Sequence, residues 1–166
     1  AGRVVVDVSV CRGAERAVLP TCRRHRIGAV VWAPLNGGWL TGKYRRGQLP
    51  PPASRAEREP THFDHGGDWR DTKHALVERL AAIAGEAGIT LPGLAIGFCL
   101  AHPAVSAVLI GPRTQGQLVE LLTLADVRLD ADTLRAVDAV APPGTDVNPA
   151  DAGFVPHTLD PATLRR

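Results

Sequence analysis

Three short apolar runs separated by helical patterns constrain the fold of this chain more than any other feature. They are residues 4–10 (Val-Val-Val-Asp-Val-Ser-Val), 29–33 (Ala-Val-Val-Trp-Ala) and 106–110 (Ser-Ala-Val-Leu-Ile). Runs this short and this rich in β-branched residues favour buried strands over helices. Because helical segments separate them, we expect parallel strands that helices cover.

Apolar residues recur at helical spacing between and after these strands. Pro20 is expected to kink or restart the first helix, and Pro92 suits the first turn of the third. Gly88 is a typical stop signal for the helix before it. The expected helices cover residues 14–25, 71–87, 92–102, 115–125 and 131–140.

Residues 35–70 are rich in Gly, Pro, Arg, Asp and His and show no sustained period. A segment of this kind inside a compact domain is typical of a functional lid or a disordered excursion. Its run His62-Phe63-Asp64-His65, with Asp68, contains imidazole and carboxylate groups that suit divalent ions. No helix sets the spacing of these groups, so a solvated loop without metal is the favoured interpretation.

The number of strands indicates what kind of sheet they form. Three strands are too few to close a barrel, and an eight-stranded (β/α) barrel takes about 250 residues. We therefore expect the C-terminal portion of a (β/α)8 TIM barrel, an α/β fold, over residues 1–144, followed by a tail at 145–166. An open doubly wound sheet is less favoured, because no Gly-x-Gly-x-x-Gly turn follows a strand. The chain starts at Ala1 and contains no Met, so further sequence is expected upstream.

The turn after the third strand, residues 110–117 (Ile-Gly-Pro-Arg-Thr-Gln-Gly-Gln), has features of an anion site. Thr114 and Gln117 form a capping-box pattern, which predicts a helix N-terminus with free backbone N–H groups. Gly111 would let a phosphate approach the backbone, and Arg113 adds a guanidinium suited to it. An ordinary strand-to-helix turn with an exposed Arg explains the same residues, and both interpretations stay open.

A second motif, residues 32–44 (Trp-Ala-Pro-Leu-Asn-Gly-Gly-Trp-Leu-Thr-Gly-Lys-Tyr), follows the second strand. Trp32 could stack on a planar ring, and Lys43 could meet a pyrophosphate. From the residues alone, a core Trp with a flexible surface loop is the favoured alternative.

Composition excludes several other classes of protein. With 45% hydrophobic residues, 22% charged residues and a net charge of +2, the chain resembles a globular cytoplasmic protein and has little electrostatic attraction for nucleic acid. No apolar stretch approaches the roughly 20 residues that span a membrane, and no signal peptide is apparent. Arg23, Arg24, His25 and Arg26 are explained by a helix C-terminus, which favours positive charge. Cys11, Cys22 and Cys99 lack metal or disulfide spacing and are expected to be buried thiols.

Residues 15–24 (Glu-Arg-Ala-Val-Leu-Pro-Thr-Cys-Arg-Arg), 32–44 and 110–118 together resemble the C-terminal half of aldo-keto reductases, in the branch similar to potassium-channel beta subunits. The resemblance extends from about residue 15 to 151. It implies that the three expected strands are strands six, seven and eight of the barrel.

The resemblance further implies an NADPH site. Trp32 would stack against the nicotinamide, and the turn beside the pyrophosphate would consist of Ala33, Pro34, Leu35 and Gly37. Lys43 and Arg55 would approach the phosphates as the long loop folds over the cofactor. The region around the adenosine 2′-phosphate, ribose and adenine ring would be held by Gly111, Arg113, Gln117 and Glu120.

Three positions depart from the family pattern. Members usually have Ser at the position of Ala33, Gln near Val4 and Asn at Leu121. Each missing hydrogen bond is worth about 0.5–1.5 kcal/mol net, so we expect weakened cofactor affinity.

The catalytic Asp, Tyr, Lys and His of the family come from earlier strands, and none of their motifs is visible in this chain. Tyr44 lies outside the family's catalytic context, so no catalytic residue is assigned. Two functions remain. The chain is the NADPH-binding segment of a reductase acting on small carbonyl substrates, or it is an inactive barrel remnant or binding module. Neither the substrate nor the oligomeric state follows from the sequence. Because a divided barrel exposes a strand edge, we expect poor solubility of the isolated chain.

Overall fold

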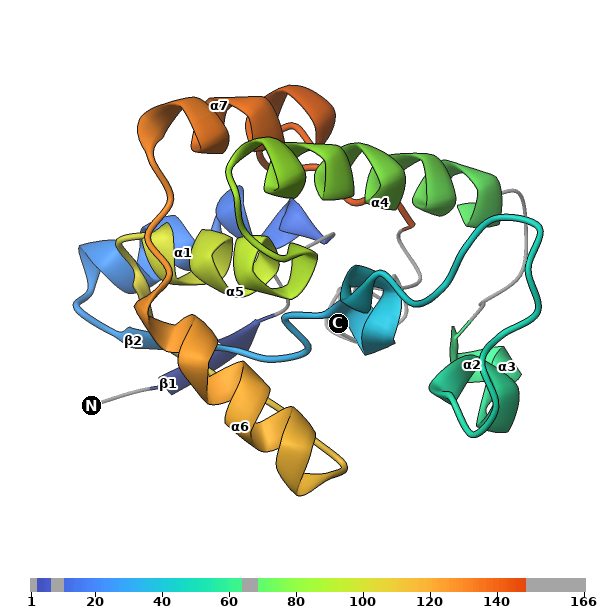
Figure 1. The fold of residues 1–166 in the computed structure, drawn as a ribbon. Helices are drawn as coiled ribbons and strands as arrows, with labels where there is room; N and C mark the ends of the chain where they lie inside the picture. The colour runs from blue at the N-terminus through green and yellow to red at the C-terminus, as the bar shows by residue number, and fades with distance from the viewer. Residues whose placement is uncertain (1–2, 7–10, 64–68, 149–166) are drawn as a thin grey trace, which may run out of the picture.

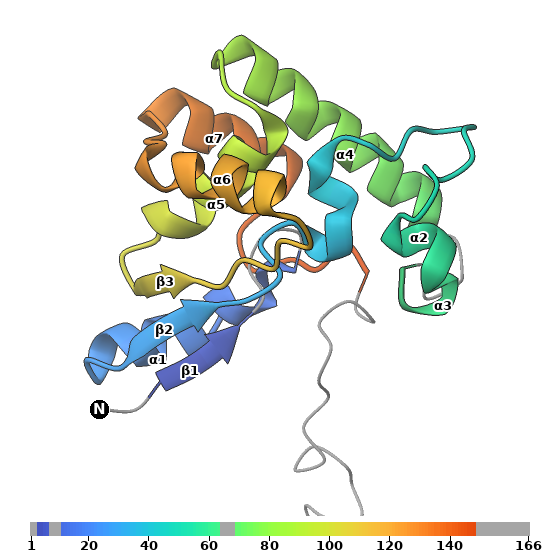
Figure 2. The ribbon, with the colours of Figure 1, turned by 60° about the horizontal axis from the view of Figure 1, so that its bottom comes forward.

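The computed structural model describes residues 3–6, 11–63 and 69–148 and contains a three-stranded parallel sheet (Figure 1). The strands β1 (Arg3–Val6), β2 (Gly28–Val31) and β3 (Val105–Val108) lie side by side in sequence order (Figure 2). Val4 is the register partner of Ala29, and Val31 is that of Val108. The expected parallel strands are thus confirmed, although residues 7–10 of the first lie outside the described residues.

The second and third strands each begin one residue earlier and end two residues earlier than expected. After β2 the backbone leaves the extended region at Ala33, whose φ is +49°. A residue in the left-handed region cannot continue a strand, so pairing stops before it.

Two helices, α1 (Val18–Arg24) and α5 (Leu91–Ala101), pack against the sheet. Ala29 and Val31 are buried at alternate positions of β2, as the period of two along a strand requires. They form one core cluster with Leu19, Cys22 and Cys99. All three cysteines are buried thiols that form no disulfide with one another, as the sequence predicted.

The first expected helix is divided. A 3-10 turn, η1 (Arg12–Glu15), comes first, and α1 begins only at Val18. Pro20 is therefore the third residue of α1, in the first turn, where its missing N–H costs no intrahelical hydrogen bond. The helix restarts before Pro20 and is not kinked by it.

A second layer consists of α4 (Trp69–Glu86) and α7 (Ala131–Val140), which pack against each other, with α4 also in contact with α5 (Figure 1). These helices agree with the expected ranges to within two residues. Thr90 caps α5 by accepting a hydrogen bond from Gly93 N at 3.1 Å, and Pro92 lies in the first turn as predicted. Leu76, Leu80 and Val137 belong to the larger core cluster.

The long segment after β2 has more structure than the sequence indicated. It contains the 3-10 segment η2 (Asn36–Thr41) and two short helices, α2 (Arg55–Arg58) and α3 (Pro60–Phe63), which lie away from the sheet in Figures 1 and 2. Trp39 is 2% exposed and stacks on Phe63, with ring centroids 4.6 Å apart. Its Nε1 donates to the Phe63 carbonyl at 3.2 Å. The segment lacks helical periodicity because a few aromatic side chains, and not an amphipathic stripe, attach it to the core.

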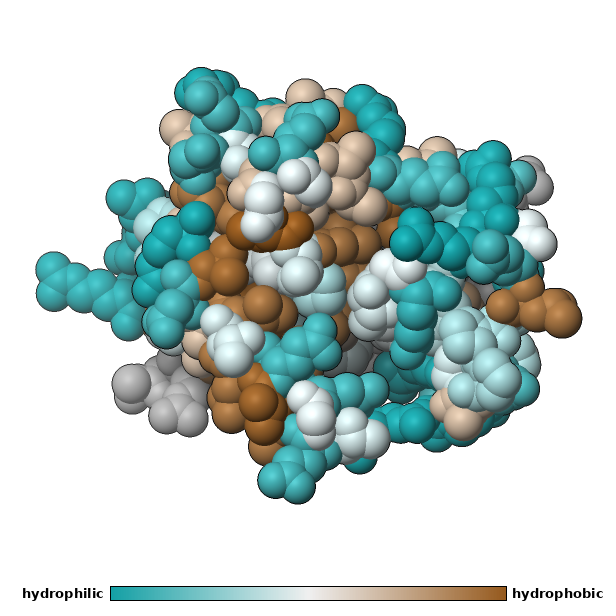
Figure 3. Space-filling view, in the orientation of Figure 1, coloured by the Kyte–Doolittle hydropathy of each residue, from teal (hydrophilic) through white to brown (hydrophobic). Residues whose placement is uncertain are grey.

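The remaining helix, α6 (Gln115–Thr123), continues as the 3-10 turn η3 (Leu124–Asp126) and buries none of its residues. It lies on the β3 side of the sheet (Figure 2). Figure 3 shows apolar side chains at the surface over α6. We call the exposed apolar residues of α6, together with the residue after β3, the α6 patch: Leu109, Leu118, Val119 and Leu122.

A buried arginine joins the region after β1 to the C-terminal helix. Arg12 is 4% exposed and forms ion pairs with Glu15 at 2.8 Å and Asp138 at 2.7 Å. Burial opposes the charge of this guanidinium, but hydrogen bonds to the two carboxylates outweigh it, so the pKa of Arg12 lies above its ordinary value. Cys11 forms an isolated antiparallel bridge with Asp146, so residues up to 146 contact the rest of the fold.

Among the described residues, no single helix is long and apolar enough to cross a membrane. Only α4 and α5 taken together reach that length and composition, and they are bent by 88° relative to each other.

Candidate functional site

The two sequence motifs begin at the same edge of the sheet. Since β2 and β3 are adjacent and parallel, their C-terminal ends meet there. Leu109 N donates to the carbonyl of Val31 at 2.7 Å, which continues the pairing to the end of both strands. Residues 32–44 and 110–117 therefore start side by side.

The turn after β2 is a tight run of left-handed residues. Ala33, Asn36, Gly37 and Gly38 have φ values of +49°, +46°, +63° and +110°. Asn36 N donates to the Ala33 carbonyl at 2.8 Å, which closes the turn. A Cβ at Gly38 would lie 3.3 Å from Cε2 of Tyr44, so glycine is needed there for both φ and space. The turn leaves Trp32 43% exposed, with its ring available for stacking.

Lys43 and Arg55 flank this glycine turn. The Lys43 ammonium lies 5.1 Å from the centroid of the Tyr44 ring, and Arg55 Nη1 lies 3.8 Å from the Cβ position of Gly37. Both cationic side chains are exposed. Arg55 forms an ion pair with Glu59 at 3.4 Å. Two residues separated by twelve positions of sequence thus present positive charge around one turn.

The turn after β3 has the predicted cap. Thr114 Oγ1 accepts from Gln117 N at 3.2 Å, while Gln117 Oε1 accepts from Arg113 N at 2.8 Å and not from Thr114 N. The side-chain amide oxygen of Gln117 is therefore already hydrogen-bonded within the turn. A Cβ at Gly111 would meet no protein atom within 4 Å, so the backbone there faces open space. Such a position admits a ligand close to the main chain.

Arg113 joins the two halves of the site. Its Nη1 donates to the carbonyl of Ala53 at 2.8 Å, two residues before Arg55. The structure therefore places Lys43, Arg55 and Arg113 around the two turns that follow β2 and β3. Within the described ion pairs, Glu59 is the only carboxylate that pairs with these three cations. This arrangement has the charge and the open backbone that attract a phosphate group.

The other residues expected at the cofactor site lie on α6 and in the turn after β2. Glu120 lies one turn further along α6 with an exposed side chain, and Pro34 and Leu35 line the turn itself. Of the three departures, Val4 lies on β1 opposite Ala29, and Leu121 is half-buried on α6.

The sequence did not reveal two features of this site. The Ala53 carbonyl lies sixty positions before its partner Arg113, and a backbone acceptor has no sequence signal. Ser54 is 5% exposed, and its Oγ has no hydrogen-bond partner among the described residues. Only its position beside Arg55 could have pointed to it. A buried hydroxyl without a partner is costly unless a ligand or water satisfies it.

Among the described residues, titratable groups suited to proton transfer do not converge on this edge. Tyr44 is 6% exposed, and its hydroxyl accepts from Ala56 N at 3.4 Å. Lys73 and His74 are buried against Trp39, 4.9 Å from its ring in each case. Burial lowers the pKa of His74, and the charges of Arg70 and Arg46 lower it further. Tyr44 thus belongs to the long segment and Lys73 and His74 belong to α4, and all three pack around Trp39.

Among the described residues, no three His, Cys, Asp or Glu side chains are grouped as metal ligands. The sequence candidates do not bear on this, since Asp64, His65, Asp68 and the side chain of His62 lie outside the described residues.

The sequence is similar to a family of reductases, to plant potassium channel beta subunits and to a bacterial oxidoreductase. The model of the Aldo/keto reductase family matches residues 3–142. A probable voltage-gated potassium channel beta subunit of Arabidopsis thaliana is 35% identical over 113 residues, which is 68% of this chain and 34% of the relative. The corresponding protein of Oryza sativa is 34% identical over 113 residues, which is again 68% of this chain and 34% of the relative. An uncharacterised oxidoreductase of Bacillus subtilis is 32% identical over 132 residues, which is 79% of this chain and 37% of the relative. The chain thus spans about a third of the length of these curated relatives.

A glycerol dehydrogenase from Gluconobacter oxydans has the same fold over the shared region. The TM-score is 0.68 at 20% identity, over 92% of this chain and 46% of that one. The described sheet and helices therefore correspond to part of an aldo-keto reductase barrel.

Proposed function

Because this chain belongs to the aldo/keto reductase family, we propose that it is the NADPH-binding part of a reductase that converts aldehydes or ketones to alcohols. In this proposal β1, β2 and β3 are barrel strands six, seven and eight. Active sites of such barrels lie at the C-terminal ends of the strands, where the two motifs of this chain meet.

The observation that carries the proposal is the presence of Lys43, Arg55 and Arg113 around the two turns that follow β2 and β3. The hydrogen bond from Arg113 to the Ala53 carbonyl holds the long segment beside the turn after β3. A dinucleotide with a pyrophosphate and a 2′-phosphate requires several separated cations along its length. The chain provides them on elements far apart in sequence.

The residues present fit such a cofactor on two further grounds. Gly111 faces open space where a phosphate could approach the backbone, and the buried Ser54 hydroxyl lacks a partner among the described residues. When bound, NADPH would supply the hydride that reduces a carbonyl. Trp32, with its ring partly exposed at the end of β2, would orient the nicotinamide by stacking.

The remaining contacts follow the same geometry. Ala33, Pro34, Leu35 and Gly37 would line the pyrophosphate side with the turn after β2, while Gln117 and Glu120 on α6 would face the adenosine. The left-handed φ of Ala33 costs about 1–2 kcal/mol, which the closed turn offsets.

A second function is favoured by the absence of a suitable acid at this edge among the described residues. Tyr44 is buried and hydrogen-bonded within the long segment, so it is not placed to protonate a substrate. The chain would then bind the dinucleotide without performing chemistry.

The test is a titration with NADPH, followed by fluorescence, of this chain and of the longest in-frame protein that contains it. Binding by either protein supports the cofactor site. Reduction of a panel of aldehydes by the longer protein supports the reductase, whereas binding without turnover favours the binding module. Absence of binding by both proteins would contradict the proposal and would show that the departures at Val4, Ala33 and Leu121 dominate.

A further inference from the structure

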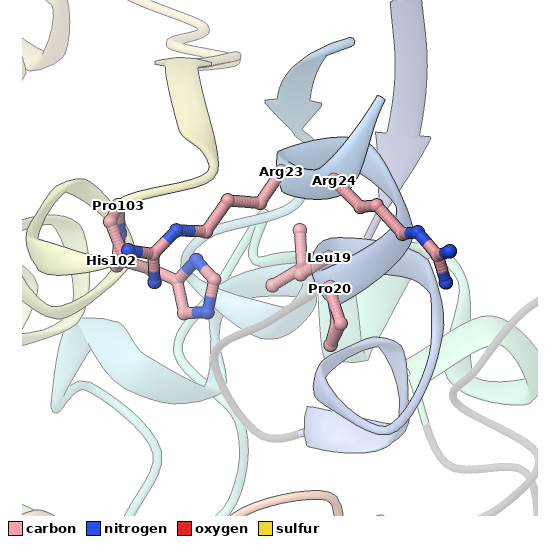
Figure 4. A pocket seen from close by; sticks show the side chains of 6 residues that line it. All are labelled: Leu19, Pro20, Arg23, Arg24, His102 and Pro103. Atoms are coloured by element: carbon pink, nitrogen blue, oxygen red, sulfur yellow. The ribbon is translucent and has the colours of Figure 1, made fainter. Parts of the chain in front are cut away.

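A cavity of about 490 Å³ lies between the C-terminal end of α1 and the end of α5 (Figure 4). It is lined by Leu19, Pro20, Arg23, Arg24, His102 and Pro103. α1 leads into the start of β2, and Pro103 precedes the start of β3. The cavity therefore lies at the N-terminal ends of the strands, opposite the edge to which we assigned the cofactor.

Positive charge and hydrogen-bond donors face this cavity from two elements. The Arg23 side chain extends toward His102 and Pro103, whereas Arg24 points in the opposite direction (Figure 4). Among the described residues, neither guanidinium has a carboxylate partner, and no carboxylate lines the cavity. The positive charge of Arg23 is therefore available to a ligand.

His102 has a defined tautomer. Its Nδ1 accepts a hydrogen bond from Ala104 N at 3.1 Å, so in the neutral ring the proton is on Nε2, which is a donor. Burial lowers the pKa of His102. The negative charge of Glu15 raises this pKa, while the positive charges of Arg12 and Arg23 lower it further, and the net shift is downward. The ring is thus a neutral donor next to a permanent cation.

We propose that this cavity binds a small aromatic anion, a phosphate monoester or a carboxylate, whose charged group lies between Arg23 and His102. Guanidinium and imidazole donors suit such a group, because charge-assisted hydrogen bonds are the strong ones. The apolar part of the ligand lies against the exposed rings of Pro20 and Pro103, since Leu19 beneath them is fully buried.

The test uses phenyl phosphate, benzoate and inorganic phosphate as probes of the full chain, with the imidazole resonances of His102 as the readout. We expect saturable shifts with phenyl phosphate or benzoate, weaker binding of inorganic phosphate, and a rise in the pKa of His102 on binding. Arg23→Gln should weaken binding about tenfold, the effect of one lost charge-assisted hydrogen bond. His102→Asn keeps an acceptor for Ala104 N and should also weaken binding; because this variant lacks the imidazole, the backbone amide resonance of Ala104 is the readout for it.

Arg24→Gln is the matched control, because it removes the same charge from a side chain that points away from His102. It should change the affinity about twofold or less. Equal losses for Arg23→Gln and Arg24→Gln, or equal affinity for inorganic and phenyl phosphate, would show general attraction to a basic surface and overturn the proposal. Shifts that fail to saturate would do the same. NADPH should not compete, since its proposed site lies at the opposite ends of the strands.

Discussion

Arg113 donates a hydrogen bond from Nη1 to the carbonyl oxygen of Ala53 at 2.8 Å, across sixty positions of sequence. This contact joins the turn after β3 to the segment that carries Arg55. It also fixes the guanidinium of Arg113, which follows Gly111 by two residues in a turn where the Gly111 backbone faces open space and a phosphate could approach.

Replacing Arg113 should weaken NADPH binding more than it destabilises the fold. Arg113→Ala should lower affinity by about tenfold or more, since hydrogen bonds to charged groups are worth about 1.5–3 kcal/mol. Fluorescence titration measures this. Arg128→Ala is the control, because Arg128 is also exposed and also bonds backbone carbonyls, at Ala125 and Val127. Equal affinities of the two variants would remove Arg113 from the site.

A side chain at Gly111 should affect ligand binding and not folding. Gly111→Ala places a Cβ where no protein atom lies within 4 Å, so the melting temperature should stay unchanged while NADPH affinity falls. Gly85→Ala also meets open space, on α4, and should stabilise the chain by up to about 1 kcal/mol without altering affinity. If Gly111→Ala binds NADPH as well as the parent chain does, no ligand approaches that backbone.

The long segment depends on Trp39. Trp39→Ala removes the stack on Phe63 and the hydrogen bond to the Phe63 carbonyl, so the free energy of unfolding should fall by about 3–5 kcal/mol. Urea denaturation measures the loss. Trp69→Ala removes a tryptophan that is 43% exposed and should cost much less. Similar costs for both variants would mean that residues 36–63 are not anchored through Trp39.

Two histidines should make the fold sensitive to mild acid. Burial is the main cause that lowers the pKa values of His74 and His102. As the pH falls through about 6.5, the unfolded chain binds protons before the folded chain does, so stability present above that pH is progressively lost toward the lower folded-state pKa values. Denaturation between pH 7.5 and 5 should show this loss. The double variant His74→Gln/His102→Asn should show a shallower slope; an unchanged slope would assign the loss to other groups.

The α6 patch should promote self-association. Val119 and Leu122 are 58% and 57% exposed, and among the described residues β3 has no strand partner on its outer side. Val119→Glu/Leu122→Lys should therefore reduce concentration-dependent light scattering. Leu49→Glu is the control, because Leu49 is 92% exposed on the long segment away from the patch. A chain that is monomeric at all concentrations would contradict this prediction.

Local patterns were sufficient for the three strands and for most helices, although the first expected helix is divided and α1 begins only at Val18. The β-branched runs predicted all three parallel strands, and the apolar spacing of α4, α5 and α7 predicted helices that the structure confirms. The cap formed by Thr114 and Gln117 was also visible, since both residues belong to one turn. Such features depend on interactions between residues close together in the chain, so the local sequence pattern is enough to predict them.

What only the tertiary structure decided involves groups that are far apart in the chain. The stack of Trp39 on Phe63, the bond from Arg113 to the Ala53 carbonyl and the cavity between Arg23 and His102 have no periodic signal. The sequence determined which segments form strands and helices, because propensity and hydrophobic period are local. The positions of the cations around the sheet edge were decided by packing, because they depend on backbone groups and side chains that come together only in the folded chain.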